Sequence, residues 1–169
     1  MKMTYKNIKN RLQLKGRQKE VDKVIAKFSS FINGYIFCFP DFNKVIPVPK
    51  NVISTYLIPE VRQQYILKGK PVWESWSNAN WGTETNAYNC QKENSKTFTF
   101  YTDNVVPKII AIIAAAFPNI EFIYEFADEE KGYNCGCFRF KGGDCQRQYF
   151  NDCSKEAYKL AIKLHPHQA

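Results

Sequence analysis

Histidine is scarce in this sequence: the 169 residues include two, His165 and His167, both within the last five positions. Because chain ends are often frayed, we expect both side chains to lie in a poorly ordered tail. This scarcity argues against Ser–His and Cys–His nucleophilic dyads and against a histidine general base. The sequence also has no Walker loop and no Gly-x-Gly-x-x-Gly run after a strand, so nucleotide-driven chemistry has no support. We therefore expect neither an enzyme nor a bound cofactor.

Long apolar runs are missing as well. No stretch approaches the ~20 apolar residues that span a bilayer, and the first residues lack the apolar segment of a secretory signal. A chain of this length buries about 70% of its unfolded surface, and 13 Phe, 10 Tyr and 3 Trp supply its core. The 6 cysteines are therefore not needed as a disulfide framework. We expect reduced thiols in a cytoplasmic protein that makes no membrane contact.

Acidic residues are few in the first part of the chain. Residues 1–70 contain 14 Lys and Arg against 4 Asp and Glu, a net charge of +10, whereas residues 71–169 carry −2. Together these give the formal charge of +8. Such asymmetry is typical of a surface for an anionic partner, with nucleic acid the first candidate. A solvated basic face that keeps the protein soluble is the alternative interpretation.

The hydrophobic pattern indicates mixed helices and strands. Residues 8–15 alternate between apolar and polar side chains, which predicts a half-buried strand. The outer face of this strand would carry Lys9, Arg11, Gln13 and Lys15. Apolar residues then recur at helical spacing over residues 17–31, before Asn33-Gly34. The segment 35–39 is a short strand or a buried run, and residues 53–70 have weak helical periodicity.

The second half of the chain has clearer periodicity. It predicts strands over 97–101, 120–126 and 133–141, and helices over 107–117 and 154–164. The order of elements is typical of an α+β sandwich with the ferredoxin-like plan, a mainly antiparallel sheet with helices packed on one face, plus a C-terminal helix. We expect a single domain over residues 1–169, with the other face of its sheet open to partners.

Several motifs occur in an order that resembles a known family. They are Asn10-Arg11-Leu12 before Gly16, Ile46-Pro47-Val48-Pro49, Asn80-Trp81-Gly82-Thr83, the block Phe100 to Phe126 with its Phe117-Pro118-Asn119-Ile120 helix stop, and the glycine-bearing final hairpin. Together they resemble the YubB-like ferredoxin-fold family of phages, plasmids and other mobile elements. The resemblance spans about residues 7–143, which leaves 144–169 as a C-terminal extension with a helix. It implies a fold and a mobile-element setting, and it brings no catalytic residue.

The chain departs from this family at two places. After Trp-Gly-Thr the family usually continues Lys-Trp-Asp, where this sequence has Glu84-Thr85-Asn86. Before the second helix the family tends to have Ala-Trp-Ser-Pro-Pro, where this sequence has residues 103–107, Asp-Asn-Val-Val-Pro. If those aromatic positions form the working surface of the family, that surface is altered here.

Four cysteines suggest a zinc site, because four thiolates can close a tetrahedral structural site. They are Cys135, Cys137, Cys145 and Cys153. Their spacing argues against this, since the first two form Cys-x-Cys on a predicted strand and not the Cys-x-x-Cys of a metal knuckle. Ordinary reduced cysteines are the favoured interpretation, and a metal is the lesser alternative.

The sequence thus supports two hypotheses of different class. The first is a non-enzymatic binding protein of a mobile genetic element that acts on a host or defence-system protein or nucleoprotein in the host cytoplasm. The alternative is a direct nucleic-acid-binding accessory protein that uses the basic sheet face. The candidate partner-binding residues are Lys9, Arg11, Lys15, Trp73, Trp76, Tyr101 and Tyr133. Because Glu121 and Glu125 are expected on the same face, the face is mixed in charge, and a protein partner is favoured.

Overall fold

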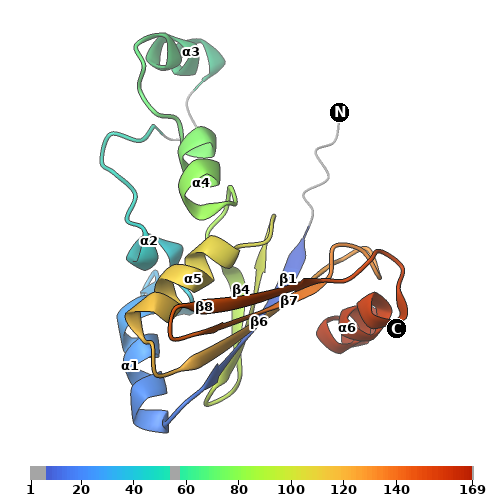
Figure 1. The fold of residues 1–169 in the computed structure, drawn as a ribbon. Helices are drawn as coiled ribbons and strands as arrows, with labels where there is room; N and C mark the ends of the chain where they lie inside the picture. Colours follow the sequence, from blue (N-terminus) through green and yellow to red (C-terminus); the bar gives the residue numbers. More distant parts are fainter. Residues whose placement is uncertain (1–6, 54–57, 169) are drawn as a thin grey trace.

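The core of the protein is a six-stranded antiparallel sheet (Figure 1). The structure is a computed structural model that describes residues 7–53 and 58–168. The strands lie in the order β4-β5-β1-β6-β7-β8. Their bounds are β1 (Ile8–Lys15), β4 (Tyr88–Asn94), β5 (Thr97–Thr102), β6 (Glu121–Asp128), β7 (Gly136–Lys141) and β8 (Asp144–Tyr149).

A ferredoxin-like unit occupies four of these strands. Along the chain it runs β1, α1 (Gln18–Phe28), β4, β5, α5 (Pro107–Ala116) and β6, and its strands are ordered β4-β5-β1-β6. The hairpin β7–β8 extends the sheet beyond β6. This arrangement confirms the predicted ferredoxin-like α+β fold.

The predicted alternation and helical spacing explain how these elements pack. In β1 the even-numbered side chains are buried, whereas the odd-numbered ones are partly or fully exposed. α1 buries Val21, Val24 and Phe28 against the same face of the sheet, and α5 begins with Pro107 at a first-turn position. α1 ends at Phe28, before the predicted end at residue 31, because the chain becomes extended at Ser29 and enters a hairpin.

A buried polar network fixes the register of the central strands. The Asn10 side chain donates to the Thr102 hydroxyl at 2.8 Å and to the carbonyls of Ile8 and Phe100. The Tyr124 hydroxyl donates to Asn10 Oδ1 at 2.7 Å. β5, β1 and β6 are therefore linked by side chains as well as by their backbone ladders. A slip of one residue would leave these buried polar groups without partners.

The C-terminal helix α6 (Lys155–Leu164) lies on the opposite face of the sheet from α1 and α5 (Figure 1). Ser154 caps it by accepting a hydrogen bond from the Ala157 amide. Its apolar face, which includes Leu160 and Leu164, is buried against Ala127 of β6. We expected the second face to be open, but α6 covers part of it, because the helix is amphipathic and buries its apolar side there.

The chain between α1 and β4 forms an insertion. It contains the two-stranded hairpin β2 (Ser30–Ile32) and β3 (Ile36–Cys38), the short helix α2 (Phe42–Val45), and the helices α3 (Pro59–Leu67) and α4 (Trp73–Trp81). The weak helical periodicity over 53–70 corresponds in part to α3, while residues 54–57 lie outside the described part of the chain. Within the described ranges, no helix has the length and apolar character that crossing a membrane requires.

Candidate functional site

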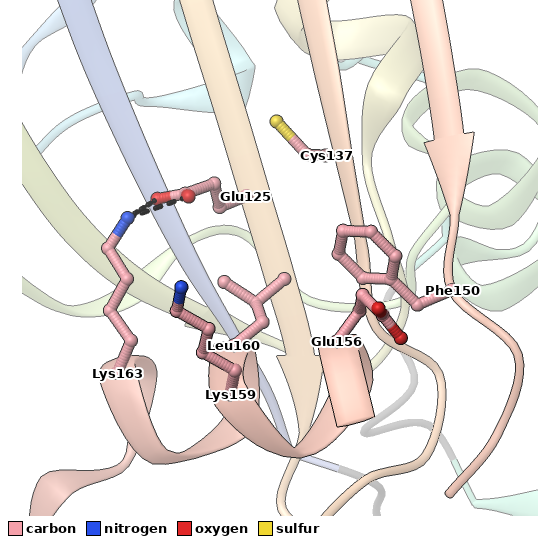
Figure 2. A pocket seen from close by; sticks show the side chains of 7 residues that line it. All are labelled: Glu125, Cys137, Phe150, Glu156, Lys159, Leu160 and Lys163. Atoms are coloured by element: carbon pink, nitrogen blue, oxygen red, sulfur yellow. Dashed lines mark hydrogen bonds and ion pairs between the residues drawn. The ribbon is translucent and has the colours of Figure 1, made fainter. Parts of the chain in front are cut away.

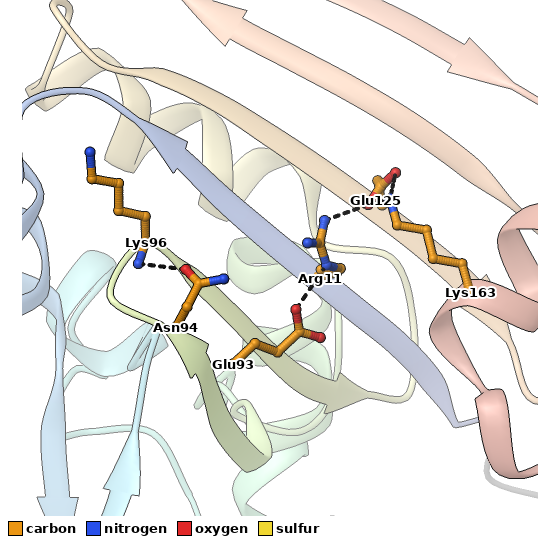
Figure 3. Close-up of polar contacts among 6 residues, drawn as sticks. All are labelled: Arg11, Glu93, Asn94, Lys96, Glu125 and Lys163. Atoms are coloured by element: carbon orange, nitrogen blue, oxygen red, sulfur yellow. Dashed lines mark hydrogen bonds and ion pairs between the residues drawn. The ribbon is translucent and has the colours of Figure 1, made fainter.

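The predicted basic residues of β1 lie on the sheet face that α6 partly covers, and an ion-pair network neutralises the central one (Figure 3). Arg11 Nε lies 3.1 Å from Glu93 Oε2, and its Nη1 lies 3.0 Å from Glu125 Oε2. Lys163 of α6 reaches across to Glu125 Oε1 at 2.7 Å. We call these four residues the charge ladder. It contains two cations and two anions, so it presents no excess positive charge.

Lys9, Tyr101 and Lys15 also lie on this face. The Lys9 ammonium is 5.5 Å from the ring centroid of Tyr101, within the range of a cation–π contact. Tyr101 stacks on Tyr88, with ring centroids 5.9 Å apart. Lys15 is exposed at the end of β1, where its backbone pairs with that of Glu121. The structure thus brings Lys9, Arg11 and Tyr101 together at neighbouring positions, with Lys15 at the far end of the strand.

His165 is packed into this region and is not part of a frayed tail. Its side chain is buried, its Nε2 lies 3.3 Å from the Ala127 carbonyl, and its ring centroid lies 6.4 Å from that of Tyr101. Burial, followed by the nearby Lys9 charge, lowers the pKa of His165, while the Ala127 carbonyl, Asp128 and Glu129 oppose this. The expectation for this residue was wrong because α6 docks on the sheet and carries the C-terminus with it.

A groove of about 420 Å³ lies between α6 and the sheet (Figure 2). Cys137 and Glu125 contribute from the sheet, and Phe150 contributes from the segment that follows β8. Leu160 and Lys159 of α6 line the helical side. Burial, and secondarily the Glu125 carboxylate, raises the pKa of the Cys137 thiol, so this thiol stays protonated at neutral pH.

The tryptophan cluster packs α4 onto the core. The rings of Trp73 and Trp76 lie 5.3 and 5.4 Å from that of Trp81, which is buried. Trp73 Nε1 donates to the Glu84 carbonyl at 3.0 Å, and Trp81 Nε1 donates to that of Ile46 at the same distance. Trp73 and Trp76 are half-buried, so each leaves part of its ring at the surface.

Tyr133 and the four C-terminal cysteines occupy separate environments. Tyr133 is exposed in the turn that precedes β7. Cys135 is buried beneath α6 and Cys137 lies in the groove. Cys145 pairs with Phe140 on the other face of the sheet, and Cys153 lies in the loop before α6. Over the ranges that the structure describes, no three His, Cys, Asp or Glu side chains group as a metal site requires.

Among the residues that the structure describes, the largest group of exposed apolar side chains within a few positions lies on the β2–β3 hairpin, which the sequence did not point to as a site. The exposed fractions are 62% for Phe31, 43% for Ile32, 75% for Tyr35 and 48% for Ile36. We call these four residues the apolar hairpin surface; Ile32 and Ile36 are paired on one face of the hairpin, and Phe31 lies on the other face beside Phe37. The ring of Phe31 packs on that of Phe37, with centroids 5.8 Å apart.

A sequence signal for this hairpin exists. Asn33 and Gly34 both have positive φ, 53° and 80°, and they begin the three-residue connection between the paired residues Ile32 and Ile36. Asn-Gly between two short apolar runs is the strongest local hairpin signal. We instead interpreted the first run as the end of a helix and the second as a short strand or a buried segment, and did not pair the two; the second run does contain the strand β3. Helical spacing in α1 extends by chance to Ile32 and hides the signal.

Comparison with known proteins identifies the family. No curated protein matches the chain significantly, and neither does any protein of solved structure. Residues 78–163 match the family described as the ferredoxin-like domain in Api92-like protein. The matched range runs from the end of α4 through the five strands β4 to β8 and into α6, so it includes the charge ladder except for Arg11. The chain therefore belongs to this family of ferredoxin-like domains, whose function is not known.

Proposed function

We propose that this chain is a non-enzymatic binding protein of a mobile genetic element, and that it acts on a host or defence-system protein or nucleoprotein in the host cytoplasm. The apolar hairpin surface is the observation that carries the proposal. The mobile-element setting rests on the resemblance to the YubB-like ferredoxin-fold family.

The apolar hairpin surface has the composition of a protein interface. Phe31 and Tyr35 are large aromatic side chains, and aromatic residues dominate the binding energy of interfaces. The side chains of Phe31 and Tyr35 are mostly exposed, while Phe37 and Cys38 of β3 contact the core and anchor the hairpin. Exposed apolar clusters of this kind are uncommon on isolated proteins and mark interaction sites.

Nucleic-acid binding by the sheet face remains the second candidate. Lys9 beside Tyr101 favours it, because cations next to aromatic rings bind single strands by stacking and charge. The charge ladder weighs against it, since the Arg11 guanidinium is engaged by two carboxylates and is not free for phosphate. A protein partner is therefore the better supported proposal.

Affinity capture with paired variants tests the protein-binding proposal. We expect tagged wild-type protein to retain one host protein at reproducible stoichiometry, and Phe31→Ser/Tyr35→Ser to lose it. Ile66→Ser/Leu67→Ser is the matched control, because it removes two exposed apolar side chains from α3. Failure of the wild type to retain a partner, or loss of the partner by the control alone, would contradict the proposal.

A salt titration tests the second candidate. Binding of a labelled single-stranded oligonucleotide is measured by fluorescence anisotropy at 50 and 200 mM salt. Several phosphate contacts would weaken the affinity on the order of tenfold or more between these concentrations. An absence of binding at 50 mM salt rules out the nucleic-acid function.

A further inference from the structure

The two edge strands of the six-stranded sheet, β4 and β8, differ in how far they are protected against pairing with a further strand. At β4 the register with β5 shifts twice, between Tyr88 and Gln91 and between Lys92 and Asn94. Bulges and edge lysines of this kind prevent another strand from pairing. At β8 the register with β7 is continuous over all six residues, and the strand contains neither proline nor lysine. All six residues of β8 are exposed.

The ladder position of each β8 residue determines which backbone groups are free. β7 and β8 are joined by the two-residue turn Gly142-Gly143, so Lys141 and Asp144 form the first hydrogen-bonded pair. Hydrogen-bonded and non-bonded pairs alternate from there. Cys145, Arg147 and Tyr149 therefore direct their N–H and C=O groups away from β7, and no strand among the described residues lies beyond them.

We propose that β8 pairs antiparallel with β8 of a second copy of this chain, across a two-fold axis through Gln146. The two sheets would join edge to edge into one continuous antiparallel sheet. Each chain would satisfy the free backbone groups of the other, and an isologous contact of this kind closes at the dimer and does not propagate. This interaction surface is distinct from the apolar hairpin surface and does not depend on the proposed function.

Symmetry and charge select the axis. A two-fold axis perpendicular to the sheet leaves every side chain on the same face of the joined sheet. Residues directly opposite each other in an antiparallel pair also share a face. The axis must therefore place one residue opposite its own copy, and it cannot fall between two neighbouring residues of the strand. An axis through Arg147 would place two guanidinium groups directly opposite each other, which destabilises a strand pair. An axis through Cys145 or Gln148 would pair no more than three residues of the strand. The Gln146 axis pairs residues 144–148, with Arg147 opposite the uncharged Cys145 of the second copy.

The position of the β2–β3 hairpin determines where the dimer would carry its two apolar hairpin surfaces. β3 contacts β4, which is the edge strand farthest from β8. The two apolar hairpin surfaces of the dimer would therefore lie at opposite ends of the joined sheet. A partner with two copies of the recognised site could then be bound by both, with a gain in avidity and no new contact.

Sedimentation equilibrium with a matched pair of variants tests the proposal. Cys145→Pro removes one outward-pointing N–H and leaves the β7–β8 ladder intact, whereas Cys145→Ser keeps the N–H. We expect the wild type and Cys145→Ser to dimerise with increasing concentration, and Cys145→Pro to raise the dissociation constant at least about tenfold. Wild-type protein that stays monomeric up to about 200 µM, or a proline variant that dimerises as well as the serine variant, overturns the proposal.

Disulfide trapping tests the register and remains informative if Cys145→Pro does not fold. In a Cys137→Ser/Cys145→Ser/Cys153→Ser background, which also removes the cysteine paired with residue 148, Gln146→Cys places a thiol on the axis, opposite its own copy in a non-bonded pair. Gln148→Cys is the control, because its two copies would be four residues apart along the strand, about 13 Å. We expect mild oxidation to cross-link the first variant and not the second. Equal cross-linking of both, or cross-linking of the control alone, contradicts the register.

Discussion

The sheet face and the apolar hairpin surface differ in whether their side chains have partners within the protein. On the sheet face, Arg11 has a 17% exposed side chain and two carboxylate partners, so its charge is used inside the protein. On the hairpin, Phe31 and Tyr35 are mostly exposed and contribute little to the core. The comparison teaches that a net charge of +8 does not locate an interface. A group that already has its partners serves stability, and one that lacks them is available for binding.

This difference predicts that substitutions separate into two classes. Those that remove a side chain with hydrogen-bond or ion-pair partners beneath or on the sheet face should lower the free energy of unfolding and spare partner binding. Those on the hairpin should spare stability and remove binding. The predictions below begin with the largest expected effect on stability.

Asn10→Ala should have the largest effect. It leaves the Tyr124 and Thr102 hydroxyls without their buried partner, and we expect a loss of about 2–4 kcal/mol in the free energy of unfolding. Urea unfolding followed by circular dichroism measures this. Gln13→Ala on the outer face of the same strand is the control, with an expected change within about 0.5 kcal/mol. A cost below about 1 kcal/mol for Asn10→Ala would show that the network does not hold the strands.

Arg11→Met should have a smaller effect. It keeps the length of the side chain but leaves Glu93 unpaired and removes one of the two cations at Glu125, so we expect a loss of about 1–2 kcal/mol. Lys15→Met, at the exposed end of the same strand, should change stability by less than about 0.5 kcal/mol. The same urea experiment compares the two variants. Equal effects would mean that the charge ladder contributes nothing beyond an ordinary surface charge.

His165 should add a pH dependence to the stability of the sheet-face region. Because burial lowers its pKa in the folded state, the unfolded chain binds more protons at mildly acidic pH, and stability falls as the pH drops below about 6.5. The slope from this one group cannot exceed about 1.4 kcal/mol per pH unit. Thermal unfolding of wild type and His165→Asn between pH 7.5 and 5 measures it. We expect a flatter profile for the variant, and identical profiles would contradict the assignment.

Phe31→Ser/Tyr35→Ser should have the smallest effect on stability. These side chains are mostly exposed, so we expect a change within about 0.5 kcal/mol in urea unfolding, together with complete loss of the captured partner. Phe37→Ser, which removes the ring between Phe31 and the core, should instead cost more than 1 kcal/mol, roughly the loss for a half-buried aromatic. If the double variant were as destabilised as Phe37→Ser, the hairpin surface would be structural.

Periodicity predicted much of the fold. The alternation in β1 and β6 and the helical spacing in α5 and α6 follow directly from which side chains are buried. β8 carries no such signal, because both of its faces are exposed and its residues are almost all polar. α4 was also missed, since its tryptophans are interspersed with Ser and Asn, which are weak helix formers.

The candidate site could be predicted only in part. The sequence shows that Arg11 and Glu125 share a sheet face, and it indicates that this face is mixed in charge. It does not show Glu93, because β4 has no regular alternation and its register with β5 is irregular. Nor does it show that α6 docks on this face, since an amphipathic helix fits either side of a sheet. Tertiary packing, and not local pattern, decides these contacts.

In-cell photo-cross-linking tests the central claim most directly. A benzoylphenylalanine is placed at Tyr35 on the apolar hairpin surface, or at Gln13 on the sheet face, and the protein is irradiated in its host. The account predicts a discrete covalent adduct with one host protein from position 35 and none from position 13. An adduct from position 13 with none from position 35 would contradict it and would make the sheet face the binding surface.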